Sequence, residues 1–232
     1  MGAILLAARL SRRFGGRKLL ASMPEPPALT VFETSLRKLT AALDQVVVVT
    51  RPELYSSLAP LCDNVRRDHG DLALRLANFD DAEQGMGASL AYAAQTLGDW
   101  RGCLVCLADM PHLASSSVAA IAAHLEGDNI VAPFHAGERG HPIGFGREYF
   151  ADLRRLSGDT GARRVMEKYT DRVLALSLGF FLAVLIAVGK TVDNPVLRGA
   201  STTGLGSVCC RTTALAPSTT LLSISALPCW LY

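Results

Sequence analysis

A loop crowded with cations follows the first apolar segment of the chain. Residues 3–21 read AILLAARLSRRFGGRKLLA, so five cations gather among glycines after a short apolar run: Arg9, Arg12, Arg13, Arg17 and Lys18. Backbone N–H groups that follow a buried strand bind phosphate oxygens, while arginine and lysine neutralise phosphate charge. The lysine is not followed by Ser or Thr, and no GxGxxG is present, so this is neither a Walker A loop nor a dinucleotide motif. The loop predicts a site for a nucleoside triphosphate, with a solvated basic turn as the alternative.

A second candidate group is Asp109, which ends the apolar run RGCLVCLADMP. A carboxylate at the end of a buried strand is costly if it stays unpaired. A magnesium ion that bridges this carboxylate and a triphosphate accounts for its placement, because magnesium prefers one or two protein carboxylates together with phosphate oxygens. Two structural alternatives stay open: Asp109 caps the helix that begins near Ser115, or it fixes the turn at Pro111.

A histidine in a turn forms a third candidate group. Gly140, His141 and Pro142 follow a turn that contains Glu138 and Arg139. The imidazole N–H of His141 can donate a hydrogen bond to a substrate, or it can satisfy nearby backbone. We favour the substrate, because this turn belongs to a strand pair that we expect beside the same site.

Two cysteines have metal-ligand spacing but an unsuitable position. Cys103 and Cys106 form a CxxC within a predicted strand. Side chains i and i+3 of a strand point to opposite faces, so we expect two core residues and no shared metal or redox pair.

Strands and helices alternate along the part of the chain that carries these groups. Apolar runs and helical spacing predict strands within residues 2–8, 45–50, 101–111 and 129–145, and helices within 31–44, 85–98, 115–127 and 147–169, the last split at Gly158. Serines at 115–117 are suited to capping the third helix. This order predicts an α/β fold: a Rossmann-like three-layer sandwich with a mostly parallel sheet and helices on both faces. Ligands then bind beyond the carboxyl ends of the strands, where the basic loop and Asp109 fall.

The last quarter of the chain has a different character. Residues 178–232 hold only four charged side chains, Lys190, Asp193, Arg198 and Arg211, and are otherwise apolar or rich in Ser and Thr. We therefore expect one domain over residues 1–177 and an atypical tail over 178–232. The tail is a membrane-associated segment, an unusual packed subdomain or a frameshifted stretch. The apolar run 173–189 reaches only the short limit for a membrane-spanning helix, so we favour a buried strand or helix.

Composition excludes several classes of protein. The 232 residues are half hydrophobic and 19% charged, which is typical of a globular chain. A net charge of +2 argues against a nucleic-acid partner. Six cysteines in a chain of this length do not form a disulfide framework, and the first residues lack the pattern of a signal peptide. We expect a cytoplasmic protein without a membrane partner.

Four motifs in order resemble the MobA-like nucleotidyltransferases, and within them the molybdenum cofactor cytidylyltransferase (MocA-like) branch. The family opening LAAGxSxRFGxxKLL is similar to LAARLSRRFGGRKLL, and GMGASL, LADMP and GHPIGF match its later motifs. The segment LSGDTGAR is also typical of it. The resemblance covers about residues 3–170.

The resemblance implies a reaction and a set of site residues. The terminal phosphate of the molybdenum cofactor (molybdopterin) attacks the α-phosphate of CTP, and pyrophosphate leaves; Ala8, where guanylyl-transferring relatives carry glycine, indicates CTP. The implied catalytic residues are Arg13, Lys18 and Asp109, with Mg²⁺ held by Asp109 and Asp193. The nucleotide would contact Leu6, Ala7, Ala8, Ser11, Arg13, Lys18, Gly85 and Ser89, and the acceptor would contact Gly140, His141 and Pro142.

Two departures from the family pattern keep other functions open. Arg9 stands where the family has glycine, in a loop whose backbone must approach phosphates, so activity could be impaired. The closing family motif DIDTP survives only as TVDNP at residues 191–195, and a chance match in a frameshifted tail has equal weight. One alternative is a non-catalytic maturation protein that binds the cofactor or a molybdoenzyme partner. Another is a nicotinamide-dependent reductase on the same scaffold.

Overall fold

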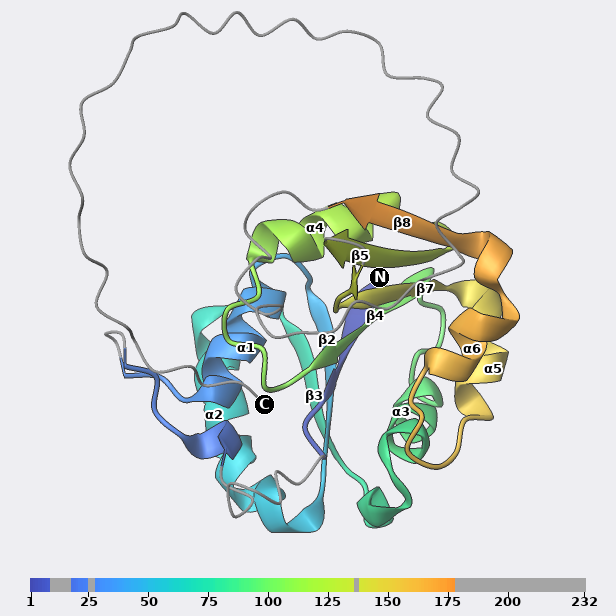
Figure 1. Cartoon of the computed structure of the whole chain (residues 1–232). Helices are drawn as coiled ribbons and strands as arrows, with labels where there is room; N and C mark the ends of the chain where they lie inside the picture. The colour runs from blue at the N-terminus through green and yellow to red at the C-terminus, as the bar shows by residue number, and fades with distance from the viewer. Residues whose placement is uncertain (9–17, 25–27, 136–137, 178–232) are drawn as a thin grey trace, which may run out of the picture. The chain divides into compact units, whose positions relative to one another are not determined.

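One mixed sheet organises the chain. The computed structural model describes residues 1–8, 18–24, 28–135 and 138–177, and all structural statements concern these residues (Figure 1). Within them eight strands form one sheet in the order β3-β2-β1-β4-β7-β5-β6, and β8 pairs with β5. The strands are β1 (Gly2–Leu6), β2 (Gln45–Thr50), β3 (Ala73–Asn78), β4 (Gly102–Leu107), β5 (Ile130–His135), β6 (Glu138–Arg139), β7 (Ile143–Gly146) and β8 (Val173–Ser177). The α-helices are α1 (Val31–Thr40), α2 (Pro52–Asp68), α3 (Met86–Ala94), α4 (Ser115–His124), α5 (Phe150–Arg154) and α6 (Arg163–Lys168). Four 3-10 helices cover Lys18–Leu20, Ala82–Gln84, Arg147–Tyr149 and Thr170–Arg172.

The sheet reverses its direction of growth at β1. The chain places β2 and then β3 on one side of β1, all parallel, and returns to place β4 parallel on the other side. In open α/β sheets such a reversal is where ligands bind, beyond the carboxyl ends of the strands. β7 runs antiparallel to both β4 and β5. The residues that follow β1 and β4 therefore meet at the reversal point.

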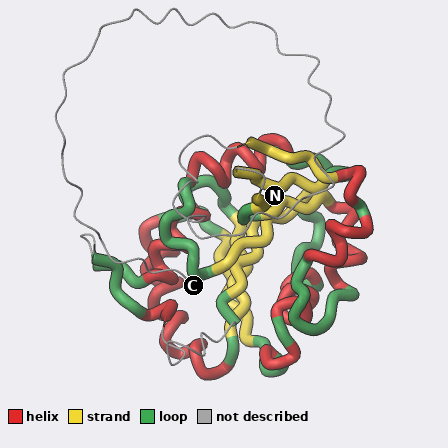
Figure 2. Tube along the Cα trace, in the orientation of Figure 1, coloured by secondary structure: helices red, strands yellow, loops and turns green. Residues whose placement is uncertain are grey.

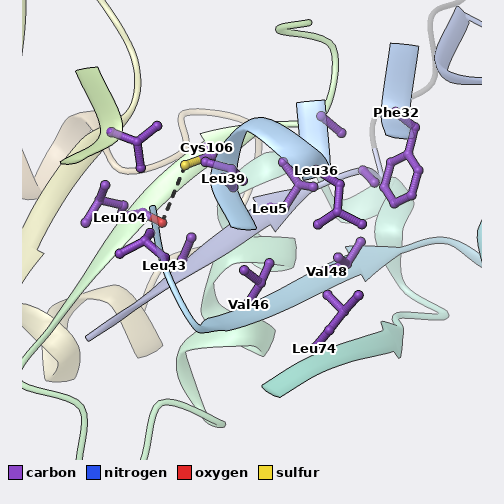
Figure 3. Packing of buried hydrophobic residues seen from close by; sticks show 14 of the residues in the cluster. Leu5, Phe32, Leu36, Leu39, Leu43, Val46, Val48, Leu74, Leu104 and Cys106 are labelled. Atoms are coloured by element: carbon purple, nitrogen blue, oxygen red, sulfur yellow. Dashed lines mark hydrogen bonds between the residues drawn. The ribbon is translucent and has the colours of Figure 1, made fainter. Parts of the chain in front are cut away.

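Helices cover both faces of the sheet and bury two separate apolar clusters. Helices α1, α2 and α4 contribute to one cluster, and α3, α5 and α6 contribute to the other (Figures 1 and 2). Figure 3 shows the first cluster, in which α1 side chains pack over β1, β2 and β4; its labelled members are Leu5, Phe32, Leu36, Leu39, Leu43, Val46, Val48, Leu74, Leu104 and Cys106. This three-layer arrangement confirms the fold class expected from the sequence.

The strands that are buried on both faces were predicted correctly, whereas one helix and one strand with a single apolar face were missed. Neither α2 nor β3 was predicted from the sequence. The buried α2 residues Leu54, Leu58, Cys62 and Val65 follow helical spacing, although Pro60 interrupts the pattern. In β3 half the side chains are exposed, so it lacks a continuous apolar run.

Two local predictions have different outcomes. The serine cap of α4 is wrong: Ala114 is the N-cap and no side chain caps the helix, while Ser115 is already helical. The CxxC prediction is confirmed, because Cys103 lies in one buried cluster and Cys106 in the other. Burial raises the pKa of both thiols strongly, which keeps them protonated and unreactive.

The apolar run that begins at Val173 opens as an edge strand and not as a buried one. None of the five residues of β8 is buried, and Leu174 is 42% exposed, so the expectation of a buried element is wrong for residues 173–177. Residues 178–189 lie outside the described residues. β8 pairs in parallel with β5, from Ile130↔Val173 to Phe134↔Ser177. Within the described part of the chain, no helix is long and apolar enough to span a membrane.

Candidate active site

A cation and a carboxylate meet at the reversal point of the sheet. Lys18 follows β1 and Asp109 follows β4, and the lysine Nζ lies 3.0 Å from Oδ2 of Asp109, to which it donates a hydrogen bond. The side chains retain 25% and 39% of their exposure. The structure thus brings together two residues that the sequence assigned to phosphate and to metal.

Core packing sets the position of Lys18. It begins the 3-10 helix Lys18–Leu20, whose middle residue Leu19 is buried in the cluster beneath α1. Beyond this helix, the Val31 N–H donates to the Ala21 carbonyl and ties the segment to the start of α1. Lys18 is therefore anchored by its neighbours and does not depend on Asp109 alone.

Asp109 lies two residues beyond the end of β4 and does not cap α4. The preceding Ala108 is buried, and its N–H donates to the Leu6 carbonyl at 3.1 Å, which extends the β1–β4 pairing past both strands. Because Ala114 is the N-cap of α4 without a side-chain partner, the helix-capping alternative for Asp109 is wrong.

His141 lies near the same end of β4. Its neighbour Ile143 pairs with Val105 in the antiparallel β4–β7 ladder, so residues before Ile143 run alongside the end of β4. Burial lowers the pKa of His141, the charge of Arg139 lowers it further, and the Asp109 carboxylate opposes both effects. A neutral imidazole has one N–H donor and one acceptor nitrogen. The two residues that flank His141 are placed by the protein itself. The Gly140 N–H donates to the Pro133 carbonyl at 2.8 Å, and Pro142 is buried.

The end of β1 uses part of its backbone within the sheet. The Ala7 N–H donates to the Val49 carbonyl at 2.8 Å, and the Leu6 carbonyl accepts from Ala108. These two groups are used within the sheet, and the contact of Leu6, Ala7 and Ala8 with a nucleotide stays a prediction. Ala8 is also buried and leads into the basic loop.

The GMG turn starts helix α3 and contacts a distant loop. Gly85 has φ +107° and precedes α3, where the Ser89 hydroxyl donates to the Gly85 carbonyl at 3.2 Å. The first backbone N–H groups of α3 donate to the loop around Gly158 and Asp159. No role was assigned to Asp159 from the sequence. The segment LSGDTGAR, which contains it, was the feature that could have pointed to it.

Arg51 is a second residue that sequence reasoning missed. It follows β2, its guanidinium is almost fully buried, and Nε donates to Glu53 Oε2 at 2.7 Å. This hydrogen bond lowers the pKa of the Glu53 carboxyl. A second ion pair, 3.6 Å long, joins Arg51 to Glu83 in the 3-10 helix just before Gly85. An arginine directly after the β-branched run QVVVVT was the available signal.

Three predicted site residues, Ser11, Arg13 and Asp193, lie outside the described residues, as does Arg9. Among the described residues, no group of three or more His, Cys, Asp or Glu side chains is placed to hold a metal ion. The described part of the site therefore offers Asp109 as one carboxylate ligand, and phosphate oxygens would supply others.

Comparisons with known proteins agree with this fold. The purine catabolism protein PucB of Bacillus subtilis is 30% identical over 168 residues, which cover 71% of this chain and 79% of PucB. The crystal structure of Rv0371c from Mycobacterium tuberculosis has a TM-score of 0.62 at 26% identity, covering 76% of this chain and 87% of that one. A structure of Rv0371c in complex with manganese has a TM-score of 0.57 at 24% identity, with the same coverage.

The match to a protein family spans the sheet and the residues of this site. Residues 3–173 match the MobA-like NTP transferase domain, from the first strand to the start of β8. This range contains the Lys18–Asp109 pair, the GMG turn and His141. The chain belongs to the MobA-like NTP transferase domain family of nucleotidyltransferases.

Proposed function

We propose that this chain transfers CMP from CTP to the terminal phosphate of molybdenum cofactor and releases pyrophosphate. The observation that carries the proposal is the Lys18–Asp109 pair at the reversal point of the sheet. A triphosphate with its metal ion can replace both partners of this ion pair. The anionic phosphate oxygens can bind the lysine in place of Asp109, and the metal ion can bind the carboxylate in place of Lys18.

The reaction needs positioning and charge neutralisation. An oxygen of the acceptor phosphate forms a bond to the α-phosphorus of CTP, and the bond from that phosphorus to the α–β bridging oxygen breaks. Pyrophosphate leaves with the electron pair of the broken bond. Lys18 neutralises charge that builds up on the triphosphate, and Arg13 in the basic loop adds a second cation.

The described residues fit a divalent metal that arrives with the nucleotide. Asp109 supplies one carboxylate, and Asp193 is proposed as the second. Rv0371c, solved with manganese, supports a divalent ion in a similar protein. We propose Mg²⁺, which when bound lowers the negative charge of the phosphates. Lys18 can then turn from Asp109 to the triphosphate.

Specificity for nucleotide and acceptor is assigned to separate segments. We propose that residues 85–89 border the base and ribose, with Ser89 holding the turn through Gly85. Ala8 in place of glycine favours CTP. On the other side, the Gly140–Pro142 segment contacts the acceptor, where the lowered pKa of His141 favours an uncharged hydrogen-bond donor at neutral pH.

A second candidate is a non-catalytic protein that binds the cofactor for a molybdoenzyme. Two observations favour it: Arg9 stands where the family pattern has glycine, and the closing family motif survives only as TVDNP. Incubating the purified chain with CTP, GTP or ATP, magnesium and molybdenum cofactor, while pyrophosphate is measured, separates the two functions. We expect release that is fastest with CTP and depends on both the metal and the cofactor. Cofactor binding without release would favour the non-catalytic protein.

A further inference from the structure

We propose that the Ser157–Asp159 segment is a positioning clamp for the GMG turn, and that Asp159 thereby sets nucleotide affinity. This inference rests on the proposed nucleotide site beside residues 85–89. Asp159 is a positioning residue here, because its observed partner is the backbone of α3.

Hydrogen bonds close the start of α3 from a distant part of the chain. The Gly87 N–H donates to the Gly158 carbonyl at 2.7 Å, and the Met86 N–H donates to Asp159 Oδ1 at 3.3 Å. The first N–H groups of a helix have no partner within the helix, and a side-chain acceptor that satisfies one stabilises the helix. No side chain of the preceding residues caps α3, so Asp159 takes the place of a local cap.

Close packing makes this contact specific to glycine. A Cβ atom at Gly87 would lie 2.8 Å from the Gly158 and Ser157 carbonyl oxygens, and one at Gly85 would lie 2.7 Å from Gly158. Real Cβ atoms do not approach backbone this closely, so the two segments fit together only because both turn positions lack side chains. The GMG motif is thereby explained by a contact within the protein as well as by ligand access.

The same connecting segment also holds the other end of α3. Arg154, the last residue of α5, donates from Nε to the Ala94 carbonyl at the end of α3, at 3.1 Å. The short stretch from Arg154 to Asp159 therefore grips α3 at both ends, so displacing it would move the GMG turn.

The test compares variants of Asp159 and of the glycine turn in the full chain. We expect Asp159→Ala to raise both the KM and the Kd for CTP with magnesium by about tenfold, with kcat changed less than about twofold. Asp159→Asn keeps an acceptor oxygen and should stay within about threefold of the wild type. Gly87→Ala should weaken the binding of CTP at least as much as Asp159→Ala does.

Matched controls remove the general effects of substitution. Gly70→Ala adds the same methyl group where no atom lies within 4 Å, and Asp99→Ala removes an exposed carboxylate with one surface ion pair. Both should leave KM and Kd unchanged.

Amide hydrogen exchange tests the clamp directly. Faster exchange at Met86 and Gly87 in Asp159→Ala would show that the clamp has opened.

Separate outcomes overturn the clamp and the proposed function. The clamp is overturned if Asp159→Ala lowers thermal stability but leaves CTP affinity intact, or if Asp159→Asn is as impaired as Asp159→Ala. The second result would mean that the carboxylate acts through its charge. A wild-type chain that binds CTP but releases no pyrophosphate would overturn the transfer reaction alone, and the clamp would still be tested by Kd. A wild-type chain that binds no nucleotide would overturn both.

Discussion

Lys18 donates a hydrogen bond to Asp109 across the junction of β1 and β4, although the residues are 91 positions apart in the sequence. Asp109 lies two residues beyond β4, which pairs with β1, and Lys18 is positioned beside it by the 3-10 helix that buries Leu19. Both side chains keep partial contact with solvent, and such ion pairs contribute only about 0–1 kcal/mol to folding. The pair can therefore open for a ligand at little cost in stability, which suits a site that binds a charged triphosphate.

Asp109→Asn should abolish metal-dependent pyrophosphate release while the fold stays intact. The amide keeps the shape of the carboxylate but loses the charge that a divalent ion needs. We expect the free energy of unfolding in urea to change by less than about 1 kcal/mol. Asp99→Asn, which alters an exposed ion pair with Arg147, is the matched control and should retain activity. Near-normal turnover of Asp109→Asn would refute the metal-binding role.

Lys18→Ala should lower kcat by roughly 10²- to 10³-fold, the usual effect of removing one preorganised charge-stabilising group. The chain offers a close control in Lys168→Ala, because Lys168 also lies 3.0 Å from an aspartate, Asp152, in an ion pair away from the site. Steady-state kinetics should show the loss only for Lys18→Ala. Equal activity of the two variants would mean that Lys18 has no role beyond its ion pair.

His141 should make stability depend on pH. Burial holds its pKa in the folded chain below the ordinary value of 6.5. As the pH falls below that value, the unfolded chain takes up a proton that the folded chain resists, so the free energy of unfolding decreases. The decrease ends once the folded chain also binds the proton.

His141→Gln carries no titrating group, so its stability should fall less than that of the wild type between about pH 7.5 and about pH 5.5. Urea unfolding at the two pH values gives the comparison. Identical pH dependence in the two proteins would contradict a partly buried His141 that resists protonation.

The sequence predicted β1, β2 and β4 because both of their faces are buried, which leaves long apolar runs such as QVVVVT. It missed β3, in which Ala73 and Arg75 are exposed, and α2, in which Pro60 breaks the pattern. The pattern of apolar residues along a segment reflects how much of that segment is buried. Elements that are half exposed and depend on tertiary packing therefore have a weaker apolar pattern in the sequence.

Site residues were predictable where they follow a buried strand, and their contacts were not. Lys18 and Asp109 were both singled out, yet their ion pair depends on β4 lying next to β1. The Met86–Asp159 hydrogen bond joins residues 73 positions apart and required the fold of α5 against α3. Spacing along the chain carries no information on such pairs.

The domain boundary that we propose at Ser177 can be tested by truncation. A chain of residues 1–177 retains β8 and should be soluble, unfold cooperatively and bind CTP weakly. A chain that ends at Arg172 loses β8 and leaves the backbone of one edge of β5 unpaired, so it should aggregate. Size-exclusion chromatography and thermal unfolding separate the two. If residues 1–177 are insoluble while the full chain folds cooperatively, the tail belongs to the core.

Arg9→Gly should strengthen CTP binding and increase transfer. Glycine adopts positive φ freely, whereas another residue in that region costs on the order of 1 to 2 kcal/mol. Arg13 and Lys18 already supply cations, so we expect relief of distortion to outweigh the lost charge, with about tenfold higher affinity if roughly 1.4 kcal/mol is recovered. Isothermal titration with CTP and magnesium gives the answer. Unchanged or weaker binding would identify Arg9 as a phosphate ligand.

The most direct test of the transfer reaction follows the α-phosphate itself. The full chain is incubated with magnesium, molybdenum cofactor and CTP labelled at the α-phosphate, and the labelled product is identified by mass spectrometry. We predict that label moves to the cofactor as a cytidylyl adduct, in equal amount to pyrophosphate, and that Asp109→Asn forms none. Label that stays in CTP, or moves equally well from GTP, would contradict a CTP-dependent cytidylyltransferase.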